Sequence, residues 1–278
     1  MTPDSLVTPI EPRDGRVARV MRSVTSQHAV HGGALCRIEV AAATSCGRQH
    51  AVNEDAHTPL DAAGPPFVVA DGVGGGAMAE LASRRLVAHL HARLAGRRAD
   101  AARIEAAMLE ADRAIAECIA QLTDAPGAAT VVLCTPANLL GTRWLVAWVG
   151  DCRAYRVVPD PAGTVEPLTR DDTFRHLGEM PPPGGSPDDP ARMVGNGATS
   201  GANVAVHDLT PDDVLALCSD GVHRHLDGDD WTRILRRPVG LAPRAEALVE
   251  AARAHGSVDD ATVLLVHCSR LGRSKGHA

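Results

Sequence analysis

The stretch Phe67-Val-Val-Ala-Asp71-Gly72-Val-Gly-Gly-Gly76 joins an apolar run to an aspartate and a glycine-rich turn. Residues 67–70 have the length and composition of a buried β-strand. A carboxylate at the edge of an apolar core is costly to desolvate unless a positive charge lies beside it. A single Asp-Gly pair most often marks a turn. The stretch therefore indicates a functional site only if the same arrangement of an acid beside an apolar run recurs elsewhere in the chain.

The arrangement does recur. Acids stand at the edges of apolar runs in Asn53-Glu54-Asp55, Gly150-Asp151, Ser219-Asp220-Gly221 and Asp259-Asp260. Basic residues are not interleaved at these points, so the acids would need another source of positive charge. Mg²⁺ and Mn²⁺ prefer carboxylate, carbonyl and water oxygens. Convergence of these segments would therefore favour a site for divalent cations.

Composition restricts the class of protein. The chain has 278 residues, of which 45% are hydrophobic and 2% aromatic, and a net charge of −6. An apolar content this high excludes wholesale disorder, and neither the charge nor the aromatic content suggests nucleic-acid binding. The sequence lacks an apolar run of roughly 18 residues and a secretory leader pattern, so we expect no membrane association. The seven cysteines are scattered without a CxxC pair and predict reduced thiols in a cytoplasmic protein.

The hydrophobic pattern is mixed. Strands are predicted at 38–43, 67–70, 130–134, 144–149, 154–158, 214–218 and 262–267. Helices are predicted at 77–94, 101–122, 229–236 and 243–254. Within 101–122, one stripe is formed by Ile104, Met108, Ala111, Ile115, Ile119 and Leu122. Because the helices are bunched rather than alternating with strands, the pattern favours an α+β fold.

The remaining segments are irregular in pattern. Residues 1–33 predict a flexible N-terminal arm, 34–270 a single domain, and 271–278 a polar tail. The run from Pro181 to Pro187 cannot hold a helix or a central strand, so 178–202 is the best candidate for a mobile loop. His223 and His225 are interpreted as solvated turn residues.

Seven motifs, in order, resemble those of the metal-dependent protein phosphatases of the PP2C (PPM) family in their compact bacterial form. They are Gly47-Arg-Gln-His-Ala-Val-Asn-Glu-Asp-Ala, Ala70-Asp-Gly-Val-Gly-Gly-Gly, Gly127-Ala-Ala-Thr, Val149-Gly-Asp-Cys-Arg-Ala-Tyr, Leu168-Thr-Arg-Asp-Asp, Leu217-Cys-Ser-Asp-Gly-Val and Asp259-Asp-Ala-Thr-Val. The resemblance runs from about residue 34 to 269. It implies an α-β-β-α sandwich of two antiparallel sheets flanked by helix pairs, with metal ions at one end. It also implies a flap, here shortened to about 172–200.

The resemblance implies a protein serine/threonine phosphatase in which two Mn²⁺ or Mg²⁺ ions activate a water for attack on phosphorus. It assigns these ions, and a weaker third, to Glu54, Asp55, Asp71, Gly72, Asp151, Asp220 and Asp259. Asp71 would bridge the two main ions and, with Asp220 and Asp259, form the catalytic set. Asp151 would share the third ion with Asp220. The implied partners are phosphorylated serine/threonine proteins, substrates of a Ser/Thr kinase in the same pathway.

The sequence departs from the family pattern at several positions. His50 stands where family members usually carry an arginine that binds the substrate phosphate. We hypothesise that protonated His50, or Arg48, takes this role. Val73 cannot donate a proton, whereas eukaryotic relatives have a histidine there that has been proposed as the general acid. Asp260 replaces the usual asparagine and adds potential negative charge near the metals.

Two other functions fit parts of the pattern. Gly72-Val-Gly-Gly-Gly-Ala formally matches a dinucleotide-binding fingerprint, but a second helix rather than a second parallel strand is predicted after 77–94. A pseudophosphatase acting as a regulatory binding module is suggested by His50. The presence of Asp71, Asp220 and Asp259 argues against that module, because a pure scaffold would not need them.

Overall fold

The computed structural model describes residues 24–32, 35–61, 64–97, 99–158, 164–210 and 213–270. Two sheets face each other, and all neighbouring strands within them are antiparallel. The larger sheet has the order β1 (Thr25–Gly32), β2 (Cys36–Ser45), β11 (Ala261–Arg270), β10 (Val214–Cys218), β7 (Arg153–Val157) and β8 (Val165–Pro167). The smaller has the order β3 (Ala56–His57), β4 (Phe67–Val73), β5 (Ala128–Pro136), β6 (Arg143–Val149) and β9 (Asn203–Asp208).

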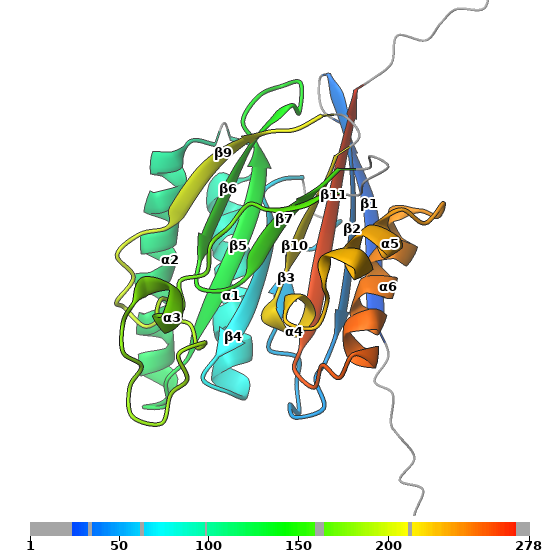
Figure 1. Ribbon diagram of the computed structural model, residues 1–278. Coiled ribbons are helices and arrows are strands. Elements are labelled where there is room, and N and C mark those ends of the chain that lie inside the picture. Colours follow the sequence, from blue (N-terminus) through cyan, green and yellow to red (C-terminus); the bar gives the residue numbers. More distant parts are fainter. Residues whose placement is uncertain are drawn as a thin grey trace, which may run out of the picture.

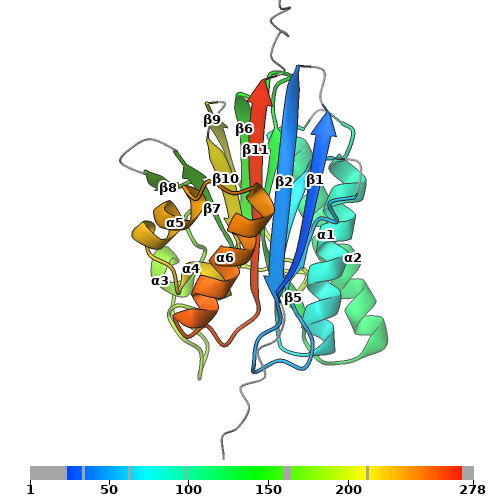
Figure 2. The same cartoon turned by 90° about the vertical axis from the view of Figure 1, so that its right-hand side faces the viewer.

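A pair of helices covers the outer face of each sheet (Figures 1 and 2). The smaller sheet carries α1 (Ala77–Leu94) and α2 (Ala101–Leu122), and the larger carries α5 (Gly228–Leu235) and α6 (Leu241–Ala254). Two single-turn helices, α3 (Phe174–Leu177) and α4 (Asp220–His223), lie outside these pairs. The predicted α-β-β-α sandwich is confirmed. Across the part of the chain that the structure describes, no helix is both long and apolar enough to span a membrane.

The core has three apolar layers, one between the sheets and one beneath each helix pair. Strand β2 shows why: Val40 and Ala42 face the other sheet, whereas Ala41 and Ala43 face the helix layer. Both faces of an interior strand are therefore buried, so its sequence is a continuous apolar run rather than an alternating one.

Helix α2 buries most of the predicted stripe. The side chain of Asp100 caps the start of the helix by accepting a hydrogen bond from the backbone N–H of Arg103 at 2.9 Å. The stripe from Ile104 to Ile119 is buried, whereas Leu122, its last residue, is 63% exposed. The helix ends there and the chain turns away, leaving the last position of the stripe without a facing surface.

The predicted N-terminal arm is wrong for residues 25–32, which form the edge strand β1. This strand pairs along β2 from Thr25 opposite Thr44 to Gly32 opposite Arg37. Main-chain hydrogen bonds to a neighbouring strand supply the order that its largely polar side chains do not predict. Residues 1–23 of the predicted arm and the predicted tail, 271–278, lie outside the described residues.

Residues 168–202, between β8 and β9, contain the predicted flap and are called the flap segment below. The structure gives residues 178–202 no helix or strand, as the run from Pro181 indicates. The side chain of Asp112 in α2 holds the C-terminal part of this segment. It accepts hydrogen bonds from the backbone N–H groups of Gly195 at 2.6 Å and Gly197 at 3.1 Å. The flap is therefore fastened to a helix on the outer face of the smaller sheet.

Candidate metal centre

The predicted acidic residues come together at one end of the sandwich, which is the lower end in Figure 1. They come from the loop after β2, the end of β4, the β6–β7 turn, the start of α4 and the residues before β11. A pocket of about 530 Å³ is lined there by Glu54, Asp71, Gly72, Asp151, Asp220 and Asp259. Asp55 is buried behind this lining. Five distant segments of sequence thus supply one acidic surface.

Contacts around Glu54 explain the local order. Its carbonyl accepts the N–H of Gly72 at 3.2 Å and the hydroxyl of Ser83 at 2.5 Å. Its side chain accepts the N–H of Gly76, directly before α1, at 2.5 Å. A Cβ on Gly72 would lie 2.6 Å from the carbonyl carbon of Ala79 and 2.9 Å from the oxygen of Glu54. Glycine is therefore required where β4, the acidic loop and α1 meet.

Asp260 fastens the other side of the loop. Its carboxylate accepts backbone N–H groups of Gly47 at 2.5 Å and Glu54 at 2.7 Å, and bonds to His50 Nδ1 at 2.9 Å. Possible ligand atoms of His50, Asp259 and Asp260 lie within 4.8 Å of one another. Both oxygens of Asp260 already accept hydrogen bonds, so this group is better described as a hydrogen-bonded cluster than as a second cation site.

Two buried carboxylate oxygens in the centre receive no hydrogen bond from the residues that the structure describes. Ser219 Oγ donates to Asp55 Oδ2 at 2.7 Å, but Asp55 Oδ1 has no hydrogen-bond partner in the described part of the chain. The same is true of Asp220 Oδ1. Because a buried carboxylate oxygen without a partner is costly, the arrangement calls for a cation.

The pKa values of the acids indicate the same excess of negative charge. Burial first, and the carboxylates of Asp260 and Asp220 after it, raise the pKa of Asp55 to about 8. Burial and the neighbouring carboxylates, Asp55 first, raise the pKa of Asp71 well above its ordinary range. Burial and the charge of Asp220 raise the pKa of Asp151 to about 7, against the opposing effect of Arg224. The donor set of oxygens and the unbalanced charge fit Mg²⁺ or Mn²⁺.

Two basic residues stand among the described residues that line the pocket, His50 and Arg224. Burial lowers the pKa of His50, but the carboxylates of Asp260, Glu54 and Asp259 outweigh it and the net pKa is raised. Arg48, the alternative phosphate-binding residue, is exposed and lies outside the pocket lining.

Arg224 was missed by the sequence analysis. Its Nη2 lies 2.8 Å from Asp151 Oδ2 and its Nη1 lies 3.0 Å from Asp220 Oδ2. Asp220 and Arg224 are four residues apart, the spacing that brings side chains together on one helix turn. An arginine four residues after Asp220 of the Ser219-Asp220-Gly221 motif was therefore the feature of the sequence that could have predicted this contact.

The prediction that His223 is a solvated turn residue is wrong. The side chain is buried, and Nε2 bonds to the carbonyl of Asp151 at 2.9 Å. The reason is the tight packing of α4 on the start of β11, where Gly221 meets the carbonyl of Asp260 without room for a Cβ. Burial lowers the pKa of His223 to about 3, so the ring is neutral and donates from Nε2.

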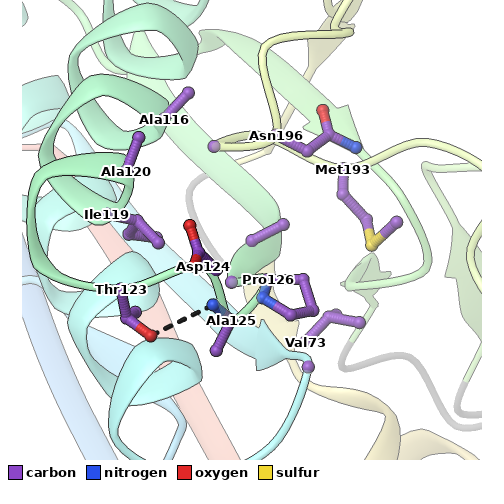
Figure 3. Close-up of a pocket in the computed structure, with 14 residues that line it drawn as sticks. Val73, Ala116, Ile119, Ala120, Thr123, Asp124, Ala125, Pro126, Met193 and Asn196 are labelled. Carbon is purple, nitrogen blue, oxygen red and sulfur yellow. Dashed lines mark hydrogen bonds between the residues drawn. The ribbon is translucent and has the colours of Figure 1, made fainter.

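A second hollow of about 490 Å³ adjoins the acidic pocket and shares Val73, Gly74 and Met193 with it. Figure 3 shows Ile119 and Ala120 of α2 on one side and Met193 and Asn196 of the flap segment on the other. This groove is bounded by the last turns of α2 and by the segment that Asp112 holds.

The family model described as protein phosphatase 2C matches residues 42–255. Comparison of the sequence with curated proteins gave no match.

Solved structures show the same fold. The catalytic domain of the serine/threonine protein phosphatase PstP in complex with two manganese ions is 25% identical, with a TM-score of 0.71 over 84% of this chain and 99% of that chain. The PPM Ser-Thr phosphatase MsPP from Mycobacterium smegmatis in complex with cacodylate is 25% identical, with a TM-score of 0.69 over 82% and 97%. The serine/threonine phosphatase of S. agalactiae is 21% identical, with a TM-score of 0.68 over 83% and 99%.

Proposed function

The chain belongs to the protein phosphatase 2C family, and on that premise we propose that it hydrolyses phosphoserine and phosphothreonine in proteins with the help of two Mn²⁺ or Mg²⁺ ions. The observation that carries this proposal is the pair of buried carboxylate oxygens, one of Asp55 and one of Asp220 beside Asp71, to which no described residue donates a hydrogen bond. The two manganese ions in the PstP catalytic domain support the choice and number of ions.

We assign the ions to the carboxylates of Glu54, Asp55, Asp71, Asp220 and Asp259 and the carbonyl of Gly72. When bound, such ions supply positive charge for phosphoryl oxygens and an activated water. The chain itself supplies the convergence of carboxylates and their rigidity. Asp71 is fixed within β4, and Asp55 is oriented by the hydroxyl of Ser219.

We assign the substrate phosphate to His50. Its Nδ1 is held by Asp260, and the raised pKa favours the protonated, cationic ring. This orientation leaves Nε2 as the donor that we assign to a phosphoryl oxygen. Val73, in the same pocket, has no proton to give the leaving alkoxide, so we do not assign a side-chain acid at that position.

The surroundings of the pocket suit a protein substrate better than an enclosed small molecule. Phe174, Pro182, Pro190 and Met193 of the flap segment line the pocket together with the acids. We propose phosphorylated Ser/Thr proteins, substrates of a kinase in the same pathway, as partners, and the cytoplasm as the location.

Hydrolysis of phosphoserine and phosphothreonine peptides by the purified protein, with and without Mn²⁺, tests the proposal. We expect Mn²⁺-dependent release of phosphate that is abolished by EDTA and by Asp71→Asn. Asp229→Asn, which neutralises an exposed acid on α5, is the matched control and should retain activity. Phosphopeptide binding without turnover in the presence of Mn²⁺ would instead support a regulatory binding module.

A further inference from the structure

We propose that the guanidinium of Arg224 is the built-in cation of the Asp151–Asp220 pair, so that this centre holds two metal ions and has no third. The inference rests on the proposed function, because it concerns the same acidic centre. It differs from the sequence-based expectation that Asp151 and Asp220 share a third, weaker ion.

The position of the Arg224 guanidinium between the two acids carries the proposal. One terminal nitrogen of Arg224 lies 2.8 Å from a carboxylate oxygen of Asp151, and the other lies 3.0 Å from an oxygen of Asp220. The side chains of the two acids are 4% and 12% exposed, so solvent does little to compensate their charges. A planar guanidinium can bridge two carboxylates in this way, and a divalent ion bound by the same two acids would have to displace it.

The backbone around the pair fixes the arrangement. Arg224 follows the last residue of α4, four positions after Asp220, which keeps both side chains on one side of the turn. The preceding residue, His223, bonds to the carbonyl of Asp151 at 2.9 Å. Consecutive residues of one turn therefore hold the main chain and the side chain of Asp151.

A role for Arg224 in binding the substrate phosphate fits less well. Both terminal nitrogens already contact carboxylates, and Nη2 also donates to the carbonyl of Asp188 in the flap segment at 3.1 Å. Turning the guanidinium toward a substrate would leave the buried carboxylate of Asp151 without its cation and would remove the partner of Asp220 Oδ2. We therefore place Arg224 as a positioning residue that also connects the flap to the centre.

A third divalent ion does not fit the pair as the structure shows it. Its arrival would release the guanidinium, whose positive charge would then lie unpaired beside the ions of the centre. Like charges held close together in a partly buried site repel each other.

Anomalous scattering from crystals soaked in graded MnCl₂ tests the proposal by position as well as by number. For the unaltered protein we expect two manganese peaks beside Asp71 and none between Asp151 and Asp220, even at the highest concentration. Arg224→Ala, or Arg224→Gln if the alanine variant folds poorly, should gain a third peak between these two acids. Equilibrium dialysis with manganese analysis should show the same gain in solution.

Arg175→Ala is the matched control, because Arg175 pairs with Asp188 in the same flap segment without touching the centre. It should keep two peaks. A third peak in the unaltered protein, or no gained peak in either Arg224 variant, would overturn the inference while leaving the two-ion centre intact. The absence of any manganese from the unaltered protein would contradict the proposed function itself.

Discussion

The carboxylate of Asp260 accepts the backbone N–H of Glu54 at 2.7 Å, although 206 positions separate the two residues. The same carboxylate binds His50 and the N–H of Gly47, so the segment before β11 holds the whole acidic loop in place. Two departures from the family pattern, His50 and Asp260, are thus direct contacts of each other. The carboxylate of Asp260 therefore organises the loop that carries Glu54 and holds the ring of His50 in place.

We expect Asp260→Asn to destabilise the fold. An asparagine has one acceptor oxygen, so in either orientation its amide NH₂ faces a backbone N–H, that of Gly47 or of Glu54. Leaving such a buried donor unsatisfied costs about 1–3 kcal/mol. Urea denaturation should show a fall of this size in the free energy of unfolding, with Asp229→Asn as control. An unchanged midpoint would mean that the loop does not depend on this carboxylate.

The assignment of His50 to the substrate predicts an asymmetry between two neighbouring basic residues. His50→Ala should raise the KM for a phosphopeptide by about ten- to a hundredfold, because a hydrogen bond to a charged group is worth about 1.5–3 kcal/mol. Arg48→Ala should leave KM within about twofold, since this exposed side chain is outside the pocket. Steady-state kinetics at saturating Mn²⁺ measures both. Equal effects of the two variants would place the phosphate elsewhere.

The pattern of the sequence predicts the interior of the fold better than its edges. All seven predicted strands are interior strands of the two sheets, whereas β1, β8, β3 and β9 were missed. These four are the edge strands. An interior strand is buried on both faces and its apolar run is visible in the sequence. An edge strand is short, or polar on one face, and owes its order to main-chain hydrogen bonds that leave no compositional trace.

The site shows a similar division. The acids were found because each follows or precedes an apolar run, which is a local signal. Arg224, His223 and Asp112 were not found, because apart from the spacing of Asp220 and Arg224 their contacts are with partners far away in sequence. Arg224 and His223 bind Asp151, 73 and 72 positions away, and Asp112 reaches Gly195 over 83 positions. Such pairings become visible only when the topology is known.

Gly72→Ala should impair the fold and the metal centre together. The added Cβ would meet the backbone of Ala79 and Glu54, and overpacking of this kind costs about 1–3 kcal/mol. Gly228→Ala is the matched control, because a Cβ on Gly228 would meet no atom of the described residues within 4 Å. Thermal denaturation with and without Mn²⁺ should show a lower Tm and a smaller stabilisation by Mn²⁺ for Gly72→Ala alone. Equal behaviour of both variants would show that the close approach at Gly72 is not required.

The lowered pKa of the buried His223 ring predicts that the folded state loses stability in acid. Its pKa is about 3 when folded and 6.5 in the unfolded chain, and its buried Nδ1 has no partner among the described residues. Well above pH 6.5 the ring is neutral in both states. As the pH falls, only the unfolded chain takes up the proton, so the folded state loses stability. Between about pH 7 and about pH 5 this amounts to about 2 kcal/mol.

His223→Gln keeps a donor for the carbonyl of Asp151 but does not titrate. Its free energy of unfolding, measured in urea with a chelator present, should therefore fall by about 2 kcal/mol less than that of the unaltered protein over this pH interval. Other titrating groups are common to both proteins and cancel in the difference. Parallel pH dependences would show that the ring becomes protonated inside the fold.

Asp112 provides the last prediction, because one carboxylate of α2 holds three backbone N–H groups of the flap segment. It accepts from Gly195 at 2.6 Å, Gly197 at 3.1 Å and Thr199 at 3.3 Å. Asp112→Ala removes all three acceptor contacts, and we expect the segment to detach. Limited proteolysis with mass spectrometry should then show faster cleavage within residues 178–202 than in Glu105→Ala, which removes an exposed acid from the same helix.

Asp112→Asn separates the local role from a global one. Its single acceptor oxygen can hold part of the segment, so the cleavage rate should lie between those of the unaltered protein and Asp112→Ala. The free energy of unfolding should fall by about 1–3 kcal/mol for Asp112→Ala. If that free energy fell while cleavage within 178–202 stayed unchanged, Asp112 would be a support of the core rather than the anchor of the flap. Faster cleavage in the order predicted would show that the groove beside the acidic pocket is bounded by a segment that one buried carboxylate keeps in place.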